Sequence, residues 1–198
     1  MRKLLMLTAC AVLTAFLAGN AAAEQLRGRL AVTGKLGVTN PADNERNIPE
    51  GKLIVSSDAG FIGGGGFLYG MDDNVAMEID VTRSSYHTSG FGTAGVTDLS
   101  VGVQYRFPER QRFIPYGAAG LDVLINDLSG NRYVKTVLGM HLSAGVDYMA
   151  MRQVALTAEL KGVKAFSSDV REFNNGGKVG EFDPSSLSLL VGARLFFN

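Results

Sequence analysis

Charged residues recur at alternate positions within segments of this sequence that are otherwise apolar. Because alternate side chains of a β-strand point to the same face, charges from several strands would meet on one enclosed surface. Charges away from water are tolerated only when they are paired or hydrated. We therefore predict an ion-paired network toward one end of the enclosed space. Its members are Arg27, Arg29, Glu78, Asp80, Arg106, Asp147, Glu159 and Arg194.

His141 and Ser143 lie two positions apart and would share the same inner face. With an acid to orient the histidine, a His–Ser pair can hydrolyse esters by nucleophilic attack, and Asp122 or Glu159 would be the nearest acid. The pair is expected in mid-strand and facing inward, where a lipid ester could hardly reach it. We therefore interpret His141 as a hydrogen-bonded interior residue, and we predict no catalytic residue and no enzyme activity.

No residue pattern indicates a metal or a cofactor. His87 lies near a strand end without a second ligand, which is not a metal site. Cys10 is the single cysteine, and the sequence has neither a phosphate-binding loop nor a dinucleotide-binding fingerprint. After the first 23 residues, 17 basic and 19 acidic residues remain, for a formal charge of −2. This balance gives no reason to expect nucleic acid as a partner.

Residues 1–23 have the organisation of a cleaved export signal peptide. Arg2 and Lys3 precede an apolar run at 4–17, and alanines at 21–23 supply the small residues of a cleavage site. The apolar run continues past Cys10, which disfavours a lipoprotein. Residues 24–198 are then a single domain, and none of their apolar runs approaches the ~20 residues of a membrane-spanning helix.

Alternation of apolar and polar residues dominates the mature sequence and predicts strands rather than helices. The final segment shows the pattern most clearly, since every second residue from Leu187 to Phe197 is apolar. Eight strands are predicted, at 25–39, 53–69, 75–82, 98–107, 113–125, 134–148, 154–161 and 187–197. Short turns alternate with longer loops, and the longest predicted loops are 40–51 and 167–184.

Aromatic residues gather at one end of the predicted strands, on the face opposite to the charges. The outward positions are Tyr69, Tyr105, Phe107, Phe113, Tyr148 and Phe197. Rings aligned at one depth are typical of the interfacial girdle of a membrane barrel, whereas a soluble all-β domain has no reason to align them. We predict an all-β fold, an eight-stranded antiparallel transmembrane β-barrel with short periplasmic turns and longer extracellular loops. Its location would be the outer membrane of a Gram-negative (diderm) bacterium.

Four segments resemble the outer-membrane protein W family. Residues 69–78 read YGMDDNVAME, residues 112–120 read RFIPYGAAG and residues 145–149 read GVDYM, while 183–196 begin DP and end VGARLF. The resemblance implies a small eight-stranded barrel associated with the passage of small hydrophobic compounds. Two features depart from the family, because Asn198 extends beyond the terminal aromatic residue and the sequence contains no Trp. Outer-membrane lipid, a small hydrophobic molecule and the barrel-assembly machinery are the expected partners.

Toward the other end of the enclosed space, the predicted inward positions become apolar. They are Ile54, Tyr86, Val96, Leu124, Val137 and Val163. These residues would form either the wall of a pocket for an apolar ligand or a small core beneath the loops. The family resemblance favours the ligand pocket.

The expected function is therefore to bind small hydrophobic molecules and pass them across the outer membrane. Charged groups beneath the apolar positions would block a straight path, so a ligand would have to leave sideways into the bilayer. The alternative is a structural or surface-recognition barrel, with the loops 40–51 and 167–184 binding a partner. A lipid-modifying enzyme is the least favoured interpretation.

Overall fold

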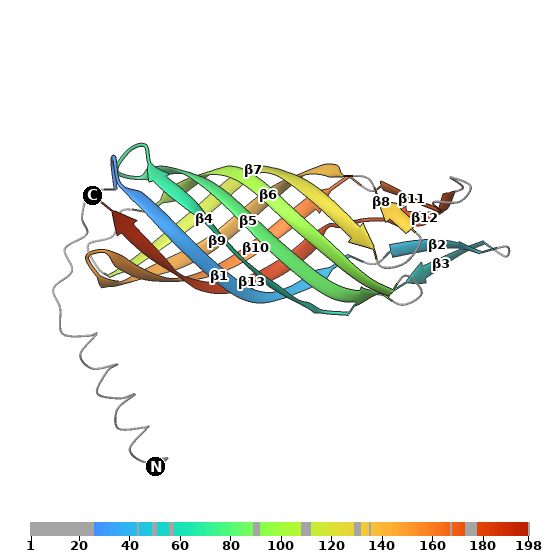
Figure 1. Cartoon of the computed structure of the whole chain (residues 1–198). Helices are drawn as coiled ribbons and strands as arrows, with labels where there is room; N and C mark the ends of the chain where they lie inside the picture. Colours follow the sequence, from blue (N-terminus) through green and yellow to red (C-terminus); the bar gives the residue numbers. More distant parts are fainter. Residues whose placement is uncertain are drawn as a thin grey trace, which may run out of the picture.

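The computed structural model describes residues 26–42, 44–48, 51–55, 58–88, 92–107, 112–128, 132–134, 136–166, 168–172 and 178–197. The signal peptide predicted at 1–23 lies outside these residues, among which no helix is long and apolar enough to cross a membrane. Eight strands form a closed antiparallel barrel (Figure 1): β1 Leu30–Pro41, β4 Gly60–Gly70, β5 Val75–Thr88, β6 Gly92–Arg106, β7 Phe113–Leu128, β9 Val137–Met151, β10 Val154–Ala165 and β13 Ser186–Phe197. Closure occurs where β1 pairs with both β4 and β13. The predicted fold class is confirmed.

Alternation along each strand separates the two faces of the barrel wall. Leu121 and Leu142 point outward and are 70% exposed, whereas Arg194 points into the lumen and is fully buried. The adjacent residues Phe196 and Phe197 show the rule most directly, since the first is buried and the second is exposed. Because the side-chain period of a strand is two, neighbours in sequence must face opposite sides.

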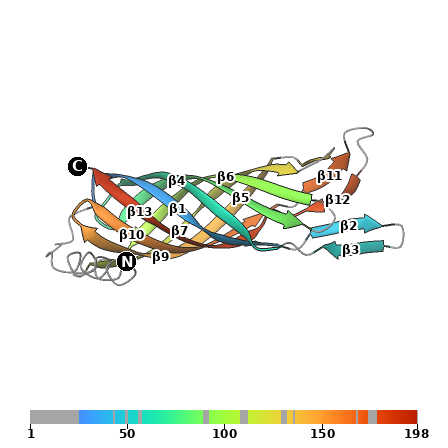
Figure 2. The same cartoon turned by 60° about the horizontal axis from the view of Figure 1, so that its bottom comes forward.

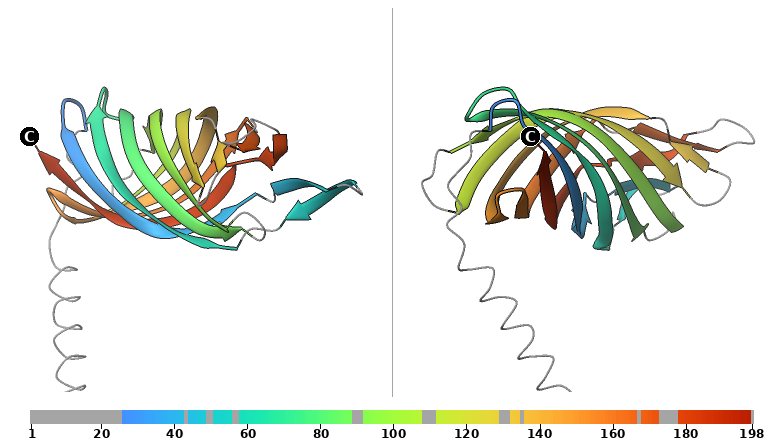
Figure 3. Two further views of the ribbon diagram at one scale, coloured as in Figure 1. Left: turned by 45° about the vertical axis from the view of Figure 1, so that its right-hand side comes forward. Right: turned by 60° about the vertical axis from the view of Figure 1, so that its left-hand side comes forward.

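Five further strands form a second sheet beyond the end of the barrel that is opposite to the C-terminus (Figures 2 and 3). In sheet order they are β3 Gly51–Val55, β2 Asn44–Ile48, β12 Lys178–Phe182, β11 Ser168–Glu172 and β8 Arg132–Val134. This corrects the prediction of loops at 40–51 and 167–184, since parts of both segments form strands. It also divides the predicted strand 53–69, since its first residues belong to β3 and only 60–69 lie in the barrel. Pairing between the loops satisfies backbone groups that would otherwise bond only to water.

The opposite end of the barrel carries short turns. At 71–74 the chain reverses, and the backbone N–H groups of Met71 and Asp72 both donate to the carbonyl oxygen of Val75. The strand predicted at 25–39 begins later than expected, at Leu30, because Gly28 adopts a left-handed conformation with φ +78°. This turn directs Leu26 into the barrel, where it is buried, although alternation had predicted it to face outward.

The predicted aromatic girdle surrounds this same end. Leu30 lies opposite Tyr69 on one side and Phe197 on the other, so these two rings share one level. Phe113 and Tyr148 are also cross-strand neighbours, with ring centroids 4.9 Å apart. Exposed rings at one level match the girdle that membrane barrels place at a lipid–water interface.

Candidate functional site

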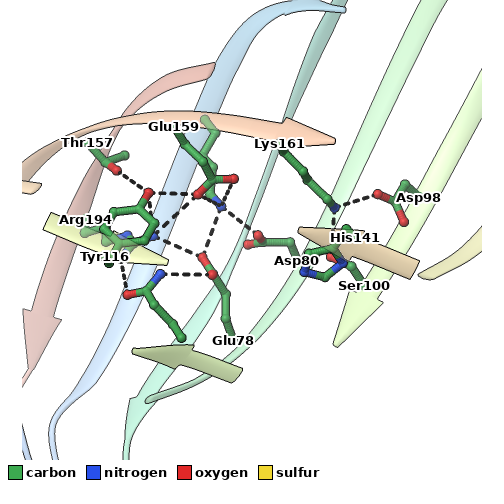
Figure 4. A network of polar contacts seen from close by, with 12 residues as sticks. Glu78, Asp80, Asp98, Ser100, Tyr116, His141, Thr157, Glu159, Lys161 and Arg194 are labelled. Carbon is green, nitrogen blue, oxygen red and sulfur yellow. Dashed lines mark hydrogen bonds and ion pairs between the residues drawn. The ribbon is translucent and has the colours of Figure 1, made fainter. Parts of the chain in front are cut away.

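Arg194 lies at the centre of an ion-paired network in the lumen, toward the end with the short turns (Figure 4). Its guanidinium donates to Asp147 Oδ2 at 3.2 Å and to Glu78 Oε1 at 3.1 Å. Arg106 Nη2 also lies 2.7 Å from Asp147 Oδ2. Gln104 Oε1 accepts from Arg106 at 2.8 Å and from Arg194 at 3.1 Å. We call these residues the lower network, together with Lys35, Asp80, Tyr116 and Glu159.

Lys35 of β1 connects the remaining carboxylates of the lower network. Its Nζ lies 3.0 Å from Glu78, 2.7 Å from Asp80 and 3.2 Å from Glu159. An ammonium group has three donors, so three carboxylates can satisfy it completely. The cross-strand neighbours of Lys35 are glycines on both sides, Gly64 on β4 and another on β13, which leaves room for its side chain. Lys35 is not among the residues predicted for the network, because alternation gives its inward direction but not the register that brings it to these carboxylates.

Tyr116 contacts both Glu159 and Arg194 and so connects two parts of the lower network. Its hydroxyl donates to Glu159 Oε2 at 2.8 Å and lies 3.0 Å from Thr157 Oγ1. The guanidinium of Arg194 lies 4.8 Å from the centre of the Tyr116 ring, a favourable cation–π geometry. Each charged side chain of the lower network therefore has a partner of opposite charge, which is what keeps buried ions in a folded protein.

An apolar cluster fills the lumen next to the lower network, at the end with the turns. Its buried members are Leu26, Ala31, Leu68, Ala76, Met149, Ala155 and Phe196. The guanidinium of Arg29 lies 4.9 Å from the centre of the Phe196 ring, so the apolar cluster and a charged layer are in direct contact. We call this cluster the apolar base.

Two arginines predicted for the network lie elsewhere. Arg27 is exposed beside the turn, where its Nε donates to Asp72 Oδ1 at 3.1 Å, and this hydrogen bond holds the pKa of Asp72 below its usual range. Arg29 is buried, but its contacts include the backbone oxygen of Arg152 at 3.0 Å and the ring of Phe196. Both arginines precede β1, so strand alternation does not dictate their direction. The other predicted members lie in the lower network: Glu78, Asp80, Arg106, Asp147, Glu159 and Arg194.

A second group of charges, the upper cluster, surrounds Lys161 of β10 (Figure 4). The Nζ of Lys161 lies 2.8 Å from Asp98 Oδ2, 3.3 Å from Asp122 Oδ1 and 3.3 Å from Ser100 Oγ. His141 Nδ1 lies 2.9 and 3.0 Å from the two carboxylate oxygens of Asp122. The carboxylates of Asp98 and Asp122 therefore share the ammonium group of Lys161 in this cluster.

The hydrogen-bond partner of His141 is Asp122, and not Ser143 as a catalytic pair would require. Among the residues that the structure describes, both hydrogen bonds of His141 go to Asp122, one of the two acids predicted for it. Its ring lies over Gly120, where an added Cβ would be 2.6 Å from the histidine Cε1. The arrangement fits a hydrogen-bonded interior histidine, while the absence of enzyme activity stays a prediction.

A small cavity of about 20 Å³ lies in the lumen beside the upper cluster. Its lining includes four residues predicted for the ligand pocket: Tyr86, Val96, Leu124 and Val163. The other lining residues are Ile62, Thr82, Ser84, Asp98, Lys161, Pro184, Ser186 and Ser188. Val137 is half-buried opposite Leu124. Ile54 belongs to β3 of the second sheet, which corrects its predicted place in the barrel wall, because the chain leaves the barrel before that residue.

The outer face of the barrel carries a larger groove, of about 630 Å³, on β7, β9 and β10. Ala119 and Gly162 have short side chains or none and form its floor, while Leu121, Met140 and Leu142 provide apolar walls. Its lining also includes His141 and Val163 and two other residues, Gly120 and Lys164. Val163 therefore lines both this outer groove and the cavity inside the lumen.

A family model for the outer membrane protein beta-barrel domain matches residues 8–194. The chain belongs to this family. It is an outer-membrane β-barrel of a Gram-negative bacterium, as predicted. No curated protein sequence matches the chain significantly.

Solved structures of outer-membrane barrels share this fold. OprG of Pseudomonas aeruginosa aligns with a TM-score of 0.71 at 15% identity, covering 89% of this chain and 99% of OprG. AlkL aligns with a TM-score of 0.60 at 16% identity, covering 88% of this chain and 92% of AlkL. Escherichia coli outer membrane protein W aligns with a TM-score of 0.52 at 16% identity, covering 88% of this chain and all of that protein (100%). The resemblance to the outer-membrane protein W family is confirmed at the level of the fold.

Membership of the outer-membrane family orients the barrel. The short turns and the aromatic girdle mark the periplasmic side, and the second sheet extends from the extracellular side (Figure 1). The lower network and the apolar base therefore lie toward the periplasm, whereas the cavity lies toward the outside. The outer groove faces lipid.

Proposed function

We propose that this outer-membrane barrel binds small hydrophobic molecules in its upper lumen and passes them across the outer membrane by lateral release into the bilayer. The observation that carries the proposal is the position of Val163, which lines both the upper cavity and the lipid-facing groove. At this level the thickness of a single strand layer separates the two spaces. An apolar molecule that crosses this layer exchanges one apolar environment for another.

The lower lumen gives the physical reason for a sideways route. A solute that moved straight down would have to separate the ion pairs around Arg194 and then displace the apolar base. Removing one partner of a buried ion pair typically costs about 3–5 kcal/mol, because the other charge remains without compensation. An uncharged hydrophobic molecule forms no ion pair or hydrogen bond that would compensate those charges.

The β9–β10 ladder defines where lateral release must occur. The ladder is continuous through the pair Val163–His141, and its last pair toward the extracellular side is Ala165–Gly139. A route from the cavity to the groove must separate these last pairs or pass above them. The ladder end has fewer hydrogen bonds to lose than the middle of the sheet, so we place the opening there.

The test of this proposal is to fill the lipid-facing groove. A Cβ at Gly162 would meet no atom closer than 3.8 Å, so Gly162→Leu can be accommodated without distorting the barrel. Ala158→Leu is the matched control, because Ala158 is exposed on the outer face of the same strand and does not line the groove. Cells that express each variant at equal folded levels are compared for uptake of toluene.

We expect Gly162→Leu to reduce toluene uptake several-fold and Ala158→Leu to leave it unchanged. Equal uptake in wild type, Gly162→Leu and a strain without the barrel would refute transport. The alternative role, a structural or surface-recognition barrel whose second sheet binds a partner, would then be favoured.

A further inference from the structure

Asp98, which lines the upper cavity, has a carboxylate oxygen without a hydrogen-bond partner among the described residues. Asp98 is 7% exposed, and its Oδ2 accepts from Lys161 at 2.8 Å. Its Oδ1 is buried and makes no hydrogen bond within the part of the chain that the structure describes. Because a buried acceptor without a partner is costly, a ligand that donates a hydrogen bond to this oxygen gains binding free energy.

The remainder of the cavity lining suits an apolar molecule with one small polar group. Val96, Leu124 and Val163 are buried and apolar, and the buried Tyr86 adds a hydroxyl group that, like Asp98 Oδ1, has no hydrogen-bond partner among the described residues. The cavity volume, about 20 Å³, corresponds to a group of roughly the size of one water molecule. A polar head group can therefore occupy the cavity next to Asp98, whereas the apolar body of the ligand must displace some of the surrounding side chains.

The charges around Asp98 decide which head group fits. An ammonium group would have to give up its hydration to enter this buried space, which is energetically costly, and would lie beside Lys161, which already holds the other oxygen of Asp98. A ketone, aldehyde or ether has only acceptors, so it could accept from the Tyr86 hydroxyl but would leave Asp98 Oδ1 without a donor. A hydroxyl group carries no charge, donates to the carboxylate and can also accept from Tyr86.

We infer that the upper cavity selects, among small hydrophobic molecules, those that carry a hydroxyl group, which donates a hydrogen bond to Asp98 Oδ1. This inference deepens the proposed function and rests on it. The substrate class becomes small apolar alcohols and phenols rather than plain hydrocarbons. Hydrogen bonds to charged groups contribute enough to favour the alcohol over a hydrocarbon of equal size by about tenfold.

The experiment uses the full mature barrel in lipid nanodiscs with labelled Ile, Leu and Val methyl groups. Toluene, benzyl alcohol and benzaldehyde are titrated separately, and NMR shifts of the Val96, Leu124 and Val163 methyls report occupation of the cavity. The wild-type protein is expected to bind benzyl alcohol about tenfold more tightly than toluene, and more tightly than benzaldehyde, which leaves Asp98 Oδ1 without a donor. This comparison needs no variant.

Asp98→Asn then changes the chemistry of the cavity at constant shape. With Lys161 donating to the amide oxygen, the amide N–H₂ occupies the place of Oδ1 and offers a donor. The alcohol-to-aldehyde ratio of affinities should fall about tenfold, because benzaldehyde now meets a donor where the alcohol had an acceptor. Asp127→Asn is the control, since Asp127 is exposed, pairs with Arg83 at 3.6 Å and does not line the cavity.

The possible outcomes separate this inference from the proposed function. Equal affinities for toluene and benzyl alcohol in wild type, with no effect of Asp98→Asn, would overturn the hydroxyl selection and leave hydrophobic binding intact. Methyl shifts that respond to none of the probes would overturn both. An alcohol preference that Asp127→Asn abolishes as well would show that net charge, and not Asp98, causes it, and this would also overturn the inference.

Discussion

The lower and upper halves of the lumen use similar residues in opposite ways. In the lower half, the charges of Lys35, Arg106 and Arg194 meet four carboxylates and form a continuous network above an apolar base. In the upper half, Lys161 and His141 contact two carboxylates, and a cavity lies beside them. The difference teaches that similar charges can lie either in an ion-paired layer packed on an apolar base or beside an open space. What decides is the packing around the charges, since both halves contain a buried carboxylate oxygen without a hydrogen-bond partner among the described residues, such as Asp147 Oδ1 below and Asp98 Oδ1 above.

The comparison predicts that changes in the lower network affect stability, while changes around the cavity affect ligand passage. Arg194→Leu is expected to have the largest effect. It leaves Asp147 and Glu78 with fewer positive partners in a fully buried place. Loss of one partner of a buried ion pair typically costs about 3–5 kcal/mol. The measurement is the free energy of unfolding in urea for barrels refolded into lipid vesicles. An Arg194→Leu barrel as stable as wild type would show that the network is not a structural plug.

The outer face provides the next largest effect and tests the separation between lumen and lipid. Leu142→Arg places a charge on an outward position that is 70% exposed to the surroundings, here the acyl chains. A charge on the lipid face near the bilayer midplane costs about 2–4 kcal/mol. The same urea titration measures it, with Leu142→Met as the control for a change of side-chain shape. If Leu142→Arg unfolds at the wild-type urea concentration, the assigned outward direction of this part of β9 is wrong.

Around the upper cavity, substitution should change passage more than stability. Leu124→Asp makes the apolar wall polar, so uptake of toluene is expected to fall several-fold in cells with matched amounts of folded barrel. Ion conductance in planar bilayers should change much less, because the lower network and not Leu124 limits the movement of water and ions. A change in conductance as large as the change in uptake would contradict the division between the two halves.

The sequence pattern was sufficient for the barrel and for the direction of most side chains. Alternation assigned Phe196 and Phe197 to opposite faces, and the structure places them so. It could not supply the register between strands that are distant in sequence, so the convergence of Lys35 on Glu159 was not predicted. Alternation also predicted the wrong side-chain directions before β1, because the chain there turns at Gly28, which has a left-handed conformation, and is not a strand.

The glycine run at 63–66 and the second sheet mark two other limits of the pattern. Alternation carries no information where neither face has a side chain, yet Gly66 is needed because an added Cβ would lie 2.0 Å from Asp80 Oδ1. This requirement appears only once β4 and β5 are paired in their register. The strands of the second sheet are short, and polar ones such as β2 Asn44–Ile48 lack the apolar alternation that identified the barrel strands. β3 Gly51–Val55 does alternate, but the pattern could not separate it from the barrel strand that follows.

The smallest effect is expected for Arg27, two positions from the buried Arg29. Its ion pair with Asp72 lies at the surface, with 65% of the Arg27 side chain and 54% of the Asp72 side chain exposed. Exposed ion pairs are screened by solvent and lose side-chain entropy when they form. Arg27→Ala should therefore leave the urea unfolding midpoint unchanged, and Arg27→Ala with Asp72→Ala together should equal wild type as well. Arg29→Ala is the contrasting variant, because it removes a hydrogen bond to Arg152 and the contact with the Phe196 ring. A clear loss of stability in Arg27→Ala would mean that this arginine reaches the lumen, as strand alternation alone had predicted.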